Sequence, residues 1–470
     1  MNGSQELITV TIQKGENLHD ALQKLDIAPD LPCGGNGTCG LCSVQVEKFG
    51  KVRSCQFRLA GTYRVSTPQR TPFDVVNAAS GIEAEEEAYD AKHPQVAIDI
   101  GTTTVAWSIR CQDRTLSGGF VNPQRRFGAD VMSRIRQCEA GHLEEMQHIL
   151  AEKLEGEIAA GLVEILQGAE EEKADIAIAA NTTMLHILNG WDCGGLGRAP
   201  FAPKSLSLHT WDETAWKRQI RTEWMSDWDY HVTELPGISA FIGADVASGI
   251  YALNMQNAKK PVLLLDLGTN GEMAIGCNGR LLAVSAAAGP AFEASEEALS
   301  VHASGLLKIL HEMLRTGAMD ATGLLADSYF ERGYPAGEVV ISQELIRELQ
   351  MAKAAIRAGI EVLIKEYGIA EDEVEAVYLA GGMGYYIDPE DAIAVGLIPP
   401  SFKNKVSAAG NTCMRGLLKF LRDPEVAGKQ LSDITNGTKE LLLADHPEFE
   451  DLYIRYMDFP RKENGSDAMG

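Results

Sequence analysis

Short apolar runs alternate with longer amphipathic stretches from Gln95 onward. The runs read V-A-I-D-I-G, D-I-A-I-A-A, V-L-L-L-D-L-G and V-E-A-V-Y-L-A-G-G, and each ends in small or polar residues. Such runs are typical of buried strands, whereas Leu143–Leu166 and Glu344–Lys365 have helical spacing. Strands that alternate with helices in this way predict an α/β fold.

The N-terminal segment has a different pattern. Residues 6–12 alternate and predict a strand, and Glu16–Leu25 has helical spacing. Residues 43–54 alternate about a central turn and predict a hairpin, and a closing strand is expected near Tyr63–Val65. Together these elements predict a small β-grasp-like module over residues 1–74.

An acidic stretch separates this module from the α/β region. Residues 75–94 include G-I-E-A-E-E-E-A-Y-D-A-K-H-P, which combines charge of one sign with few large hydrophobic residues. We expect a solvated linker, and a short helix is the alternative.

Composition excludes several classes of protein. The chain has 470 residues, of which 45% are hydrophobic, so two to four domains with real cores are expected. A net charge of −24 argues against nucleic acid or an anionic membrane as partner. The start M-N-G-S-Q-E-L lacks the basic segment of a secretory signal, and no apolar run is long enough to span a bilayer. We therefore expect a cytoplasmic protein.

Four cysteines lie close together near the start of the chain. Cys33, Cys39 and Cys42 lie in L-P-C-G-G-N-G-T-C-G-L-C, and twelve residues separate Cys42 from Cys55. The expected hairpin returns Cys55 to the loop that holds the other three, so these thiolates are predicted to ligate a [2Fe–2S] cluster. The alternatives are a disulfide knot or a structural zinc site, although a Cys₄ zinc site usually shows two C-x-x-C pairs and only one is present.

The remaining cysteines are scattered and predict isolated thiols in a reducing compartment. They are Cys111, Cys138, Cys193, Cys277 and Cys413.

Two similar motifs follow buried strands and predict a phosphate site in a duplicated fold. They read V-A-I-D-I-G-T-T-T-V-A and V-L-L-L-D-L-G-T-N-G-E-M-A, and in each an Asp (Asp99 or Asp266) ends the strand before a Gly-Thr turn. Glycine allows close backbone approach to phosphate, and carboxylates suit Mg²⁺. The predicted phosphate-binding residues are Gly101, Thr102, Thr103 and Thr104 in the first turn and Gly268, Thr269, Asn270 and Gly271 in the second.

A third glycine motif completes this site. L-A-G-G-M-G follows the strand V-E-A-V-Y, and we expect the adenosine to lie against Gly381 and Gly382. Neither a P-loop nor a dinucleotide-binding G-x-G-x-x-G that opens a helix is present. Lys353 and Arg357 lie four residues apart on one helix face, where they either approach adenine or ribose or form a solvated face.

These motifs resemble the actin-like ATPase superfamily of sugar kinases, heat-shock chaperones and actin. The resemblance implies a ribonuclease H-like fold duplicated into two lobes, residues 95–253 and 254–470, that close over ATP. It also implies that F-I-G-A-D-V-A-S-G-I at 241–250 is the first connecting helix, with Asp245 facing the γ-phosphate. The alternative is that Asp245 is an ordinary helix-end carboxylate.

A [2Fe–2S] module fused to such an ATPase resembles the reductive activators of corrinoid-dependent methyltransferase systems. Further stretches similar to that family are N-P-Q-R-R-F-G-A-D-V-M-S-R-I, A-N-T-T-M-L-H, A-A-A-G-P-A-F-E, I-R-E-L-Q-M-A-K-A-A-I-R-A-G and A-G-N-T. The resemblance implies ATP-dependent transfer of one electron from the cluster to an inactive Co(II) corrinoid, which restores Co(I). The implied partners are a corrinoid protein and an upstream low-potential electron donor, and family members suggest a homodimer.

The chain is shorter than is usual for this family, in its N-terminal hairpin and after Glu293. The closest rival is an ATP-driven activator of another low-potential enzyme, such as a dehydratase or reductase. Those activators usually share a [4Fe–4S] cluster between two subunits, and the four N-terminal cysteines argue against them. A small-molecule kinase and a chaperone-like ATPase without redox function are the other rivals.

A stretch of small side chains follows the second phosphate motif. Residues 283–293 read A-V-S-A-A-A-G-P-A-F-E, and Ala286 to Gly289 would offer a flat surface to a corrin macrocycle. Ser285 is the one hydroxyl there and would approach cobalt or a corrin amide. The alternative is tight backbone packing beside the nucleotide.

Overall fold

The protein is described by a computed structural model. It describes residues 7–25, 28–29, 42–66, 91–168, 173–225, 228–268, 270–288, 303–337, 339–381 and 387–461. Cys33, Cys39, Thr269 and Gly382, and most of the expected acidic linker, lie outside these ranges.

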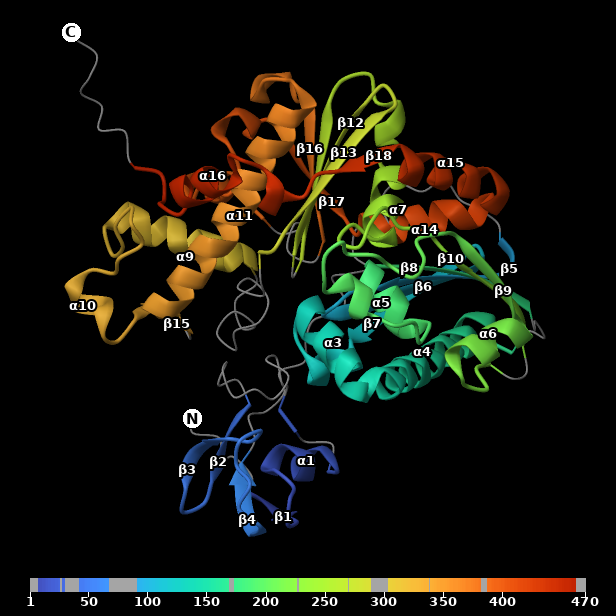
Figure 1. The fold of residues 1–470 in the computed structure, drawn as a ribbon, viewed down its shortest axis with the longest axis horizontal. Coiled ribbons are helices and arrows are strands. Elements are labelled where there is room, and N and C mark those ends of the chain that lie inside the picture. Colours follow the sequence, from blue (N-terminus) through green and yellow to red (C-terminus); the bar gives the residue numbers. More distant parts are fainter. Residues whose placement is uncertain are drawn as a thin grey trace.

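The N-terminal module is a four-stranded sheet with one helix (Figure 1). Its elements are β1 (Ile8–Ile12), α1 (Leu18–Gln23), β2 (Ser43–Val46), β3 (Gly50–Arg53) and β4 (Gly61–Ser66). The strands lie in the order β1-β4-β2-β3 with antiparallel neighbours, and the β2–β3 pair confirms the predicted hairpin. Leu18 and Leu22 of α1 bury their side chains against Val44 and Val65 of the sheet.

The next sheet has six strands in the order β7-β6-β5-β8-β10-β9. The strands are β5 (Ala91–Ile100), β6 (Thr104–Gln112), β7 (Arg114–Val121), β8 (Lys173–Ala180), β9 (His209–Asp212) and β10 (Asp229–Glu234). β5, β6 and β7 form an antiparallel meander, and β5, β8 and β10 run parallel. Because β5 begins at Ala91, the expectation that the linker extends to residue 94 is wrong at its last four positions.

Five of the six strands of the third sheet repeat this topology, and the sixth lies at the opposite edge. Its strands are β11 (Val262–Leu267), β12 (Gly271–Cys277), β13 (Arg280–Ala286), β16 (Ala376–Ala380), β17 (Val406–Gly410) and β18 (Thr438–Glu440), in the order β17-β16-β11-β12-β13-β18. β11, β12 and β13 form the meander, and β11, β16 and β17 run parallel. The repeated order confirms the predicted duplication.

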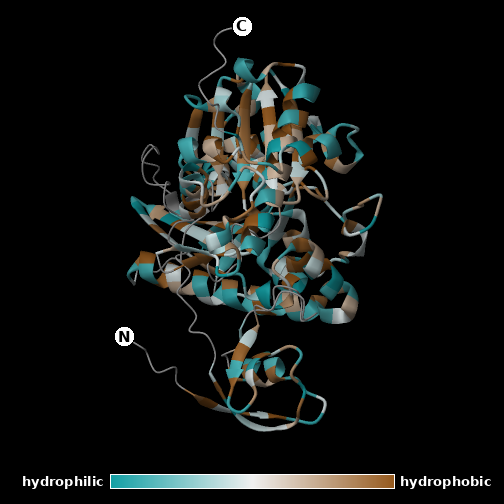
Figure 2. Cartoon of the chain, turned by 90° about the vertical axis from the view of Figure 1, so that its left-hand side faces the viewer, coloured by the Kyte–Doolittle hydropathy of each residue, from teal (hydrophilic) through white to brown (hydrophobic). Residues whose placement is uncertain are grey.

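Helices cover both sheets, and Figure 2 shows their polar residues outside the largely apolar strands. The second sheet carries α3 (Val131–Gln137), α4 (Leu143–Leu166), α5 (Thr182–Leu188) and α6 (Glu213–Ile220). The helices later in the chain are α7 (Ala244–Ala252), α9 (Ala303–Thr316), α10 (Asp327–Phe330), α11 (Gln343–Tyr367), α13 (Pro389–Ala394), α14 (Thr412–Arg422), α15 (Pro424–Gly437) and α16 (Phe449–Arg455). A short ribbon, β14 (Tyr334–Ala336) and β15 (Val339–Ile341), precedes α11. α4 and α11 match the predicted helices closely.

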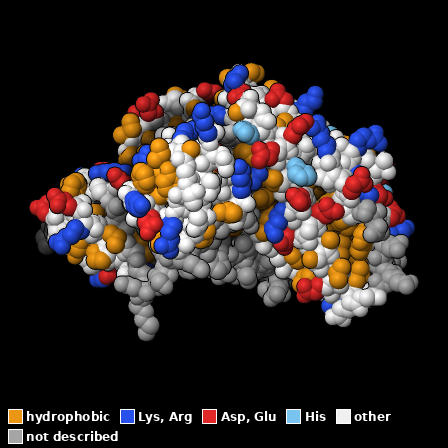
Figure 3. All heavy atoms as spheres, turned by 90° about the horizontal axis from the view of Figure 1, so that it is seen from below, with side chains coloured by type: hydrophobic (Ala, Val, Ile, Leu, Met, Phe, Trp, Pro, Cys, Tyr) orange, Lys and Arg blue, Asp and Glu red, His pale blue; other side chains and the backbone are white. Residues whose placement is uncertain are grey.

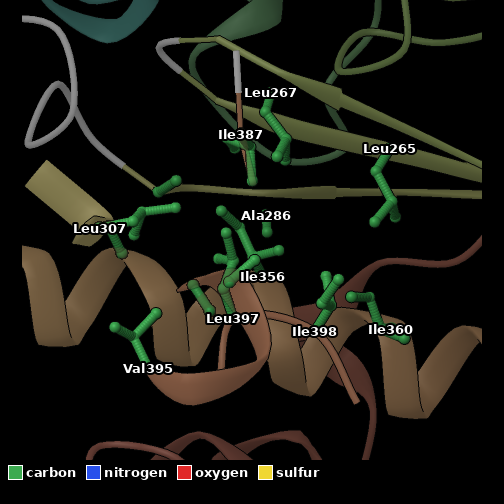
Figure 4. Packing of buried hydrophobic residues seen from close by; sticks show 14 of the residues in the cluster. Leu265, Leu267, Ala286, Leu307, Ile356, Ile360, Ile387, Val395, Leu397 and Ile398 are labelled. Atoms are coloured by element: carbon green, nitrogen blue, oxygen red, sulfur yellow. The ribbon is translucent and has the colours of Figure 1, made fainter. Parts of the chain in front are cut away.

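The helix α11 packs on the third sheet through its apolar face. Ile356 and Ile360 lie against Leu265 and Leu267 of β11 in one buried cluster, with Ala286 of β13 beside them (Figure 4). This packing fixes β11 and β13 relative to one another.

The helices α7 and α14 cross between the two sheets (Figure 1). The crossing is close because both contact surfaces carry glycine: a Cβ on Gly416 would lie 2.2 Å from the Ser248 carbonyl oxygen, and one on Gly249 would lie 2.8 Å from Thr412 Oγ1. The Ser248 hydroxyl donates to the Cys413 carbonyl over 2.8 Å. α14 also packs on β5 and β8 of the second sheet. A helix from the second half of the chain therefore covers a sheet formed by the first half.

On the face drawn in Figure 3, acidic and basic side chains are interspersed. Within the described part of the chain, no helix is both long and apolar enough to cross a membrane.

Candidate functional site

Four carboxyl groups meet where α7 lies between the two sheets. Asp99 and Asp266 occupy equivalent positions, each the penultimate residue of the first strand of its meander. Asp245, in the first turn of α7, interacts electrostatically with Asp99. Glu272 of β12 interacts with both Asp245 and Asp266, and it pairs with Asp266 across the β11–β12 ladder. The structure therefore brings the three predicted aspartates together and adds a fourth carboxyl group.

Burial makes this cluster electrostatically costly. It raises the pKa of Asp99, and it raises the pKa of Asp245 to about 7, with the charge of Asp99 adding to that shift. Burial raises the pKa of Glu272 well above its ordinary range, and Asp245 and Asp266 raise it further. Such a group of acids is stabilised by protons or by a bound cation. Among the described residues, no set of three or more His, Cys, Asp or Glu side chains has metal-binding geometry.

Two side chains of the second half of the chain reach Asp99. Asn411 is the N-cap of α14: its Oδ1 accepts from the Met414 amide, and its Nδ2 donates to Asp99 Oδ2 over 2.7 Å. The Cys413 thiol also donates to Asp99. Burial and the surrounding carboxylates raise the pKa of Cys413 well above its ordinary value, so this thiol stays protonated and acts as a donor.

The first glycine turn is tight and braced by side chains. The Gly101 amide donates to the Thr104 carbonyl over 2.9 Å, and a Cβ on Gly101 would lie 2.7 Å from that oxygen. Asn122 Nδ2 donates to the Gly101 carbonyl, and Asn181 Nδ2 donates to Thr102 Oγ1. Only glycine fits at the start of this turn.

A buried arginine holds the same turn from beneath. Arg134 of α3 donates to the Thr102 carbonyl, and its Nε donates to the Gly128 carbonyl over 3.1 Å. Burial lowers the pKa of Arg134 to about 9, which leaves the guanidinium charged at neutral pH. The stretch N-P-Q-R-R-F-G-A-D-V-M-S-R-I therefore supplies the arginine that holds the first glycine turn.

The second glycine turn lies beside the carboxylates. The Gly268 amide donates to the Asn270 carbonyl, and the Asn270 side chain is hydrogen-bonded to Glu272. Gly381, with φ of +82°, follows β16, and a Cβ there would lie 2.5 Å from Asp266 Oδ1. Gly381 thus lies beside Asp266, and its expected contact with the adenosine stays a prediction. Thr269 and Gly382 lie outside the described residues.

Lys353 and Arg357 share a face of α11, and both contact the segment that follows α16. Lys353 Nζ donates to the Tyr456 and Asp458 carbonyls, and burial lowers its pKa to about 7. Arg357 pairs with two glutamates of its own lobe and stacks on the Tyr456 ring. These contacts anchor the segment that follows α16 and are not shared with the carboxyl cluster.

Ser285, Glu272 and Asp266 are cross-strand neighbours on three adjacent strands. Ser285 pairs with Glu272 across the β12–β13 ladder, and Glu272 pairs in turn with Asp266. The expectation of a flat surface from Ala286 onward is wrong for Ala286 and Ala288, because both side chains are buried in the core under β13. Residues 289–293 lie outside the described residues.

The two described cluster cysteines fit an iron site. Cys42 precedes β2 and Cys55 follows β3, and the hairpin brings their Sγ atoms to 3.2 Å in a buried environment. Two thiolates this close can ligate the same iron atom. Gln56 Nε2 donates to the Cys55 sulfur over 3.6 Å, a contact of the kind that tunes ligand basicity. Cys33 and Cys39 lie outside the described residues.

Several residues that contact the carboxyl cluster or the first glycine turn were not predicted. The missed residues are Arg134, Asn181, Glu272, Asn411 and Cys413. For Asn181 and Asn411 a signal exists, because each begins an Asn-Thr pair directly after a buried strand, in A-A-N-T and A-G-N-T. Asn in that position caps the following helix.

Comparison with known protein families covers most of the chain. Residues 2–61 match a 2Fe-2S iron-sulfur cluster binding domain, and residues 95–258 match the RACo middle region. Residues 260–304 and 294–467 match the C-terminal domain of RACo, the ASKHA domain.

Two curated relatives are similar over long stretches. The corrinoid activation enzyme RamQ of Eubacterium limosum is 28% identical over 423 residues, covering 76% of this chain and 69% of the relative. A [Co(II) methylated amine-specific corrinoid protein] reductase of Methanosarcina barkeri is 27% identical over 273 residues, covering 47% of this chain and 50% of the relative. A solved structure of a reductive activator for corrinoid, iron-sulfur protein has a TM-score of 0.70 at 23% identity, covering 96% of this chain and 97% of that one.

Proposed function

Because the chain belongs to the family of reductive activators of corrinoid proteins, we propose that it uses ATP to return an oxidised corrinoid cofactor to its active state. One electron passes from the reduced [2Fe–2S] cluster to Co(II) of a partner corrinoid protein and yields Co(I) and the oxidised cluster. The observation that carries this proposal is the fusion of a cysteine-bearing hairpin module with two sheets whose acidic groups come together beside α7. An upstream low-potential donor then reduces the cluster again.

The residues have distinct proposed roles. Cys33, Cys39, Cys42 and Cys55 hold the cluster, which supplies electrons one at a time. Asp99 and Asp266 hold Mg²⁺ directly or through water, and Asp245 orients the water that attacks the γ-phosphate. The two glycine turns, with Gly381 and Gly382, form the nucleotide cradle.

ATP is needed because the electron transfer is uphill. Plant-type clusters have potentials of about −400 mV, and the Co(II)/Co(I) couple is generally lower still. ATP can drive the step only by interacting differently with two states of the complex. We propose that closure of the lobes on ATP favours the state in which the corrinoid is reducible, and that Ser285, in one row with Glu272 and Asp266, lies near the docked corrinoid protein.

The test is a single-turnover assay under anaerobic conditions. The pre-reduced protein is mixed with a Co(II) corrinoid protein of a methyltransferase system, and Co(I) is followed by its absorbance. We expect Co(I) to accumulate with Mg·ATP and not with Mg·ADP. Equal rates with both nucleotides, or a cluster that stays reduced throughout, would refute the proposal.

A further inference from the structure

One serine connects both lobes at the entrance to α7. The Ser239 hydroxyl donates to Glu440 Oε1 over 2.7 Å, and its oxygen accepts from the amides of Phe241 and Ile242 over 3.1 and 2.9 Å. The Ser239 carbonyl accepts from the Thr182 hydroxyl over 2.6 Å. A hydroxyl has one donor and two acceptor positions, so Ser239 uses all of them here.

The turn that Ser239 closes leads directly to Asp245. Ile242 ends the turn, Gly243 caps α7, and Asp245 lies in its first turn. Gly243 is closely packed, because a Cβ there would lie 2.5 Å from Asn181 Cα and 2.7 Å from Asp245 Oδ1. The position of the Asp245 carboxylate therefore depends on the turn that precedes it. The same turn explains why α7 begins at Ala244 rather than at the expected residue 241.

Glu440 belongs to the opposite sheet. It lies on the edge strand β18, which runs parallel to β13, and it pairs there with Ala283. The Leu441 amide donates to the Ala283 carbonyl over 2.9 Å, which holds β18 to the strand that carries Ser285. Two contacts therefore connect β13 with Ser239: the ladder between β13 and β18, and the hydrogen bond from Ser239 to Glu440.

We propose that Glu440 and Ser239 form an interlobe latch, which positions Asp245 for ATP hydrolysis and couples it to β13. The latch rests on the proposed function, since it assigns Asp245 and the end of β13 their roles. Both are positioning residues, because they act through the turn that leads to Asp245. Docking of a partner at the end of β13 would change the hydrolysis rate by moving or releasing β18.

The test compares Glu440→Ala with Glu440→Gln, which keeps an oxygen acceptor for Ser239. Lys439→Ala is the matched control, because Lys439 is the exposed neighbour on the same strand. We expect Glu440→Ala to lower kcat for ATP hydrolysis about tenfold, the loss typical of one hydrogen bond to a charged group, with less than about a twofold change in KM for ATP. Glu440→Gln and Lys439→Ala are expected to retain most of the activity.

Two further measurements make the result unambiguous. Ser239→Ala should match Glu440→Ala, and the double variant should be no slower than either single variant, because both remove the same contact. Hydrogen exchange at the amides of Phe241 and Ile242 should rise in Glu440→Ala and stay unchanged in Lys439→Ala.

Each contrary outcome overturns the latch. Unchanged exchange means that Glu440 does not hold the turn, and raised exchange with an unchanged kcat means that the turn does not position Asp245. If the kcat losses of the two single variants add in the double variant, Ser239 and Glu440 act independently and not through one contact. If the wild-type protein hydrolyses no ATP, the proposed function fails, whereas the exchange measurement still decides whether Glu440 holds the turn.

Discussion

Three acids of the carboxyl cluster have a raised pKa, which means that their charged forms are destabilised in the folded protein. Burial raises the pKa of Asp99, Asp245 and Glu272, and repulsion from neighbouring carboxylates adds to the shift at Asp245 and Glu272. Hydrogen bonds from Asn411 and Cys413 offset part of the shift at Asp99. A ligand that brings positive charge to these groups removes part of that cost. Ligand binding should therefore have a large effect on the stability of the two lobes.

We expect Mg·ATP to raise the melting temperature of the protein and ATP with excess chelator to raise it less. At a hundredfold excess over Kd, binding adds about 2.7 kcal/mol. Replacing Glu272 with Gln should reduce the difference between the two conditions, because one of the repelling acids is gone. Differential scanning fluorimetry checks this, with the exposed Glu164→Gln as control. Equal shifts in melting temperature with and without Mg²⁺ would show that no cation binds at the carboxyl cluster.

Glu234 provides a pH-dependent test in the first lobe. Its carboxylate is 1% exposed and accepts from Asn189 Nδ2 and Trp211 Nε1, and burial raises its pKa from 4.5 to about 7. A raised pKa means that the folded state binds the proton more tightly. Glu234 therefore favours folding most below pH 4.5, and that contribution is lost as pH rises through 7.

The wild type should lose stability relative to Glu234→Gln between pH 4.5 and pH 7, by at most about 3 kcal/mol. Denaturant unfolding followed by tryptophan fluorescence reports on this lobe, because Trp211 contacts the carboxylate. A difference between the two proteins that does not change with pH would show that Glu234 keeps one protonation state throughout.

At the scale of helices and strands, periodicity predicted much of the fold. The residues of α4 and α11 have unmistakable helical spacing, and the apolar runs mark β5, β8, β11 and β16. Periodicity does not say which helix crosses to which sheet. The hydrogen bond between Asn411 and Asp99 joins residues 312 positions apart, and no local pattern encodes that approach.

The same limit explains the predictions that differed from the structure. Spacing placed Lys353 and Arg357 on one face of α11, but it could not show that the C-terminal segment covers that face. Small residues such as Ala286 and Ala288 are equally compatible with an open surface and with close packing. In the structure both are buried in the core of the third sheet. Glu272 escaped notice because its burial follows from pairing with Asp266 and Ser285 on neighbouring strands.

The crossing of α7 and α14 is a sensitive point at this scale. Replacing Gly416 with Ala places a methyl group 2.2 Å from the Ser248 carbonyl oxygen, so the helices must separate. We expect a loss of about 1–3 kcal/mol in unfolding free energy, typical of overpacking. ATP hydrolysis should also fall, because Asn411 and Asp245 lie at the starts of these two helices.

Gly437→Ala at the end of α15 is the matched control, since nothing lies within 4 Å of the added methyl group. Chemical denaturation and an ATPase assay on both variants check the expectation. A Gly416→Ala protein as stable and as active as the control would mean that the helices tolerate a wider separation.

On the scale of the whole molecule, the electron and the phosphate are handled in separate parts of the chain. The cysteines of the N-terminal hairpin belong to a small sheet of their own, whereas the carboxyl cluster is shared by the two large sheets. Neither part completes the proposed reaction alone. Damage to one part should therefore leave the chemistry of the other intact.

Cys55→Ala should bleach or destabilise the [2Fe–2S] absorbance and abolish Co(II) reduction, while basal ATP hydrolysis stays within about twofold of wild type. Asp266→Asn should do the reverse: the cluster spectrum stays, but both hydrolysis and ATP-dependent Co(II) reduction fall by at least about tenfold. The measurements are visible absorbance, phosphate release and Co(I) formation on the same anaerobic samples. If Cys55→Ala reduces the corrinoid protein at the wild-type rate, the electron does not come from this cluster. If Asp266→Asn does so, ATP hydrolysis at the carboxyl cluster does not drive the transfer, and the two halves of the proposed mechanism are not coupled.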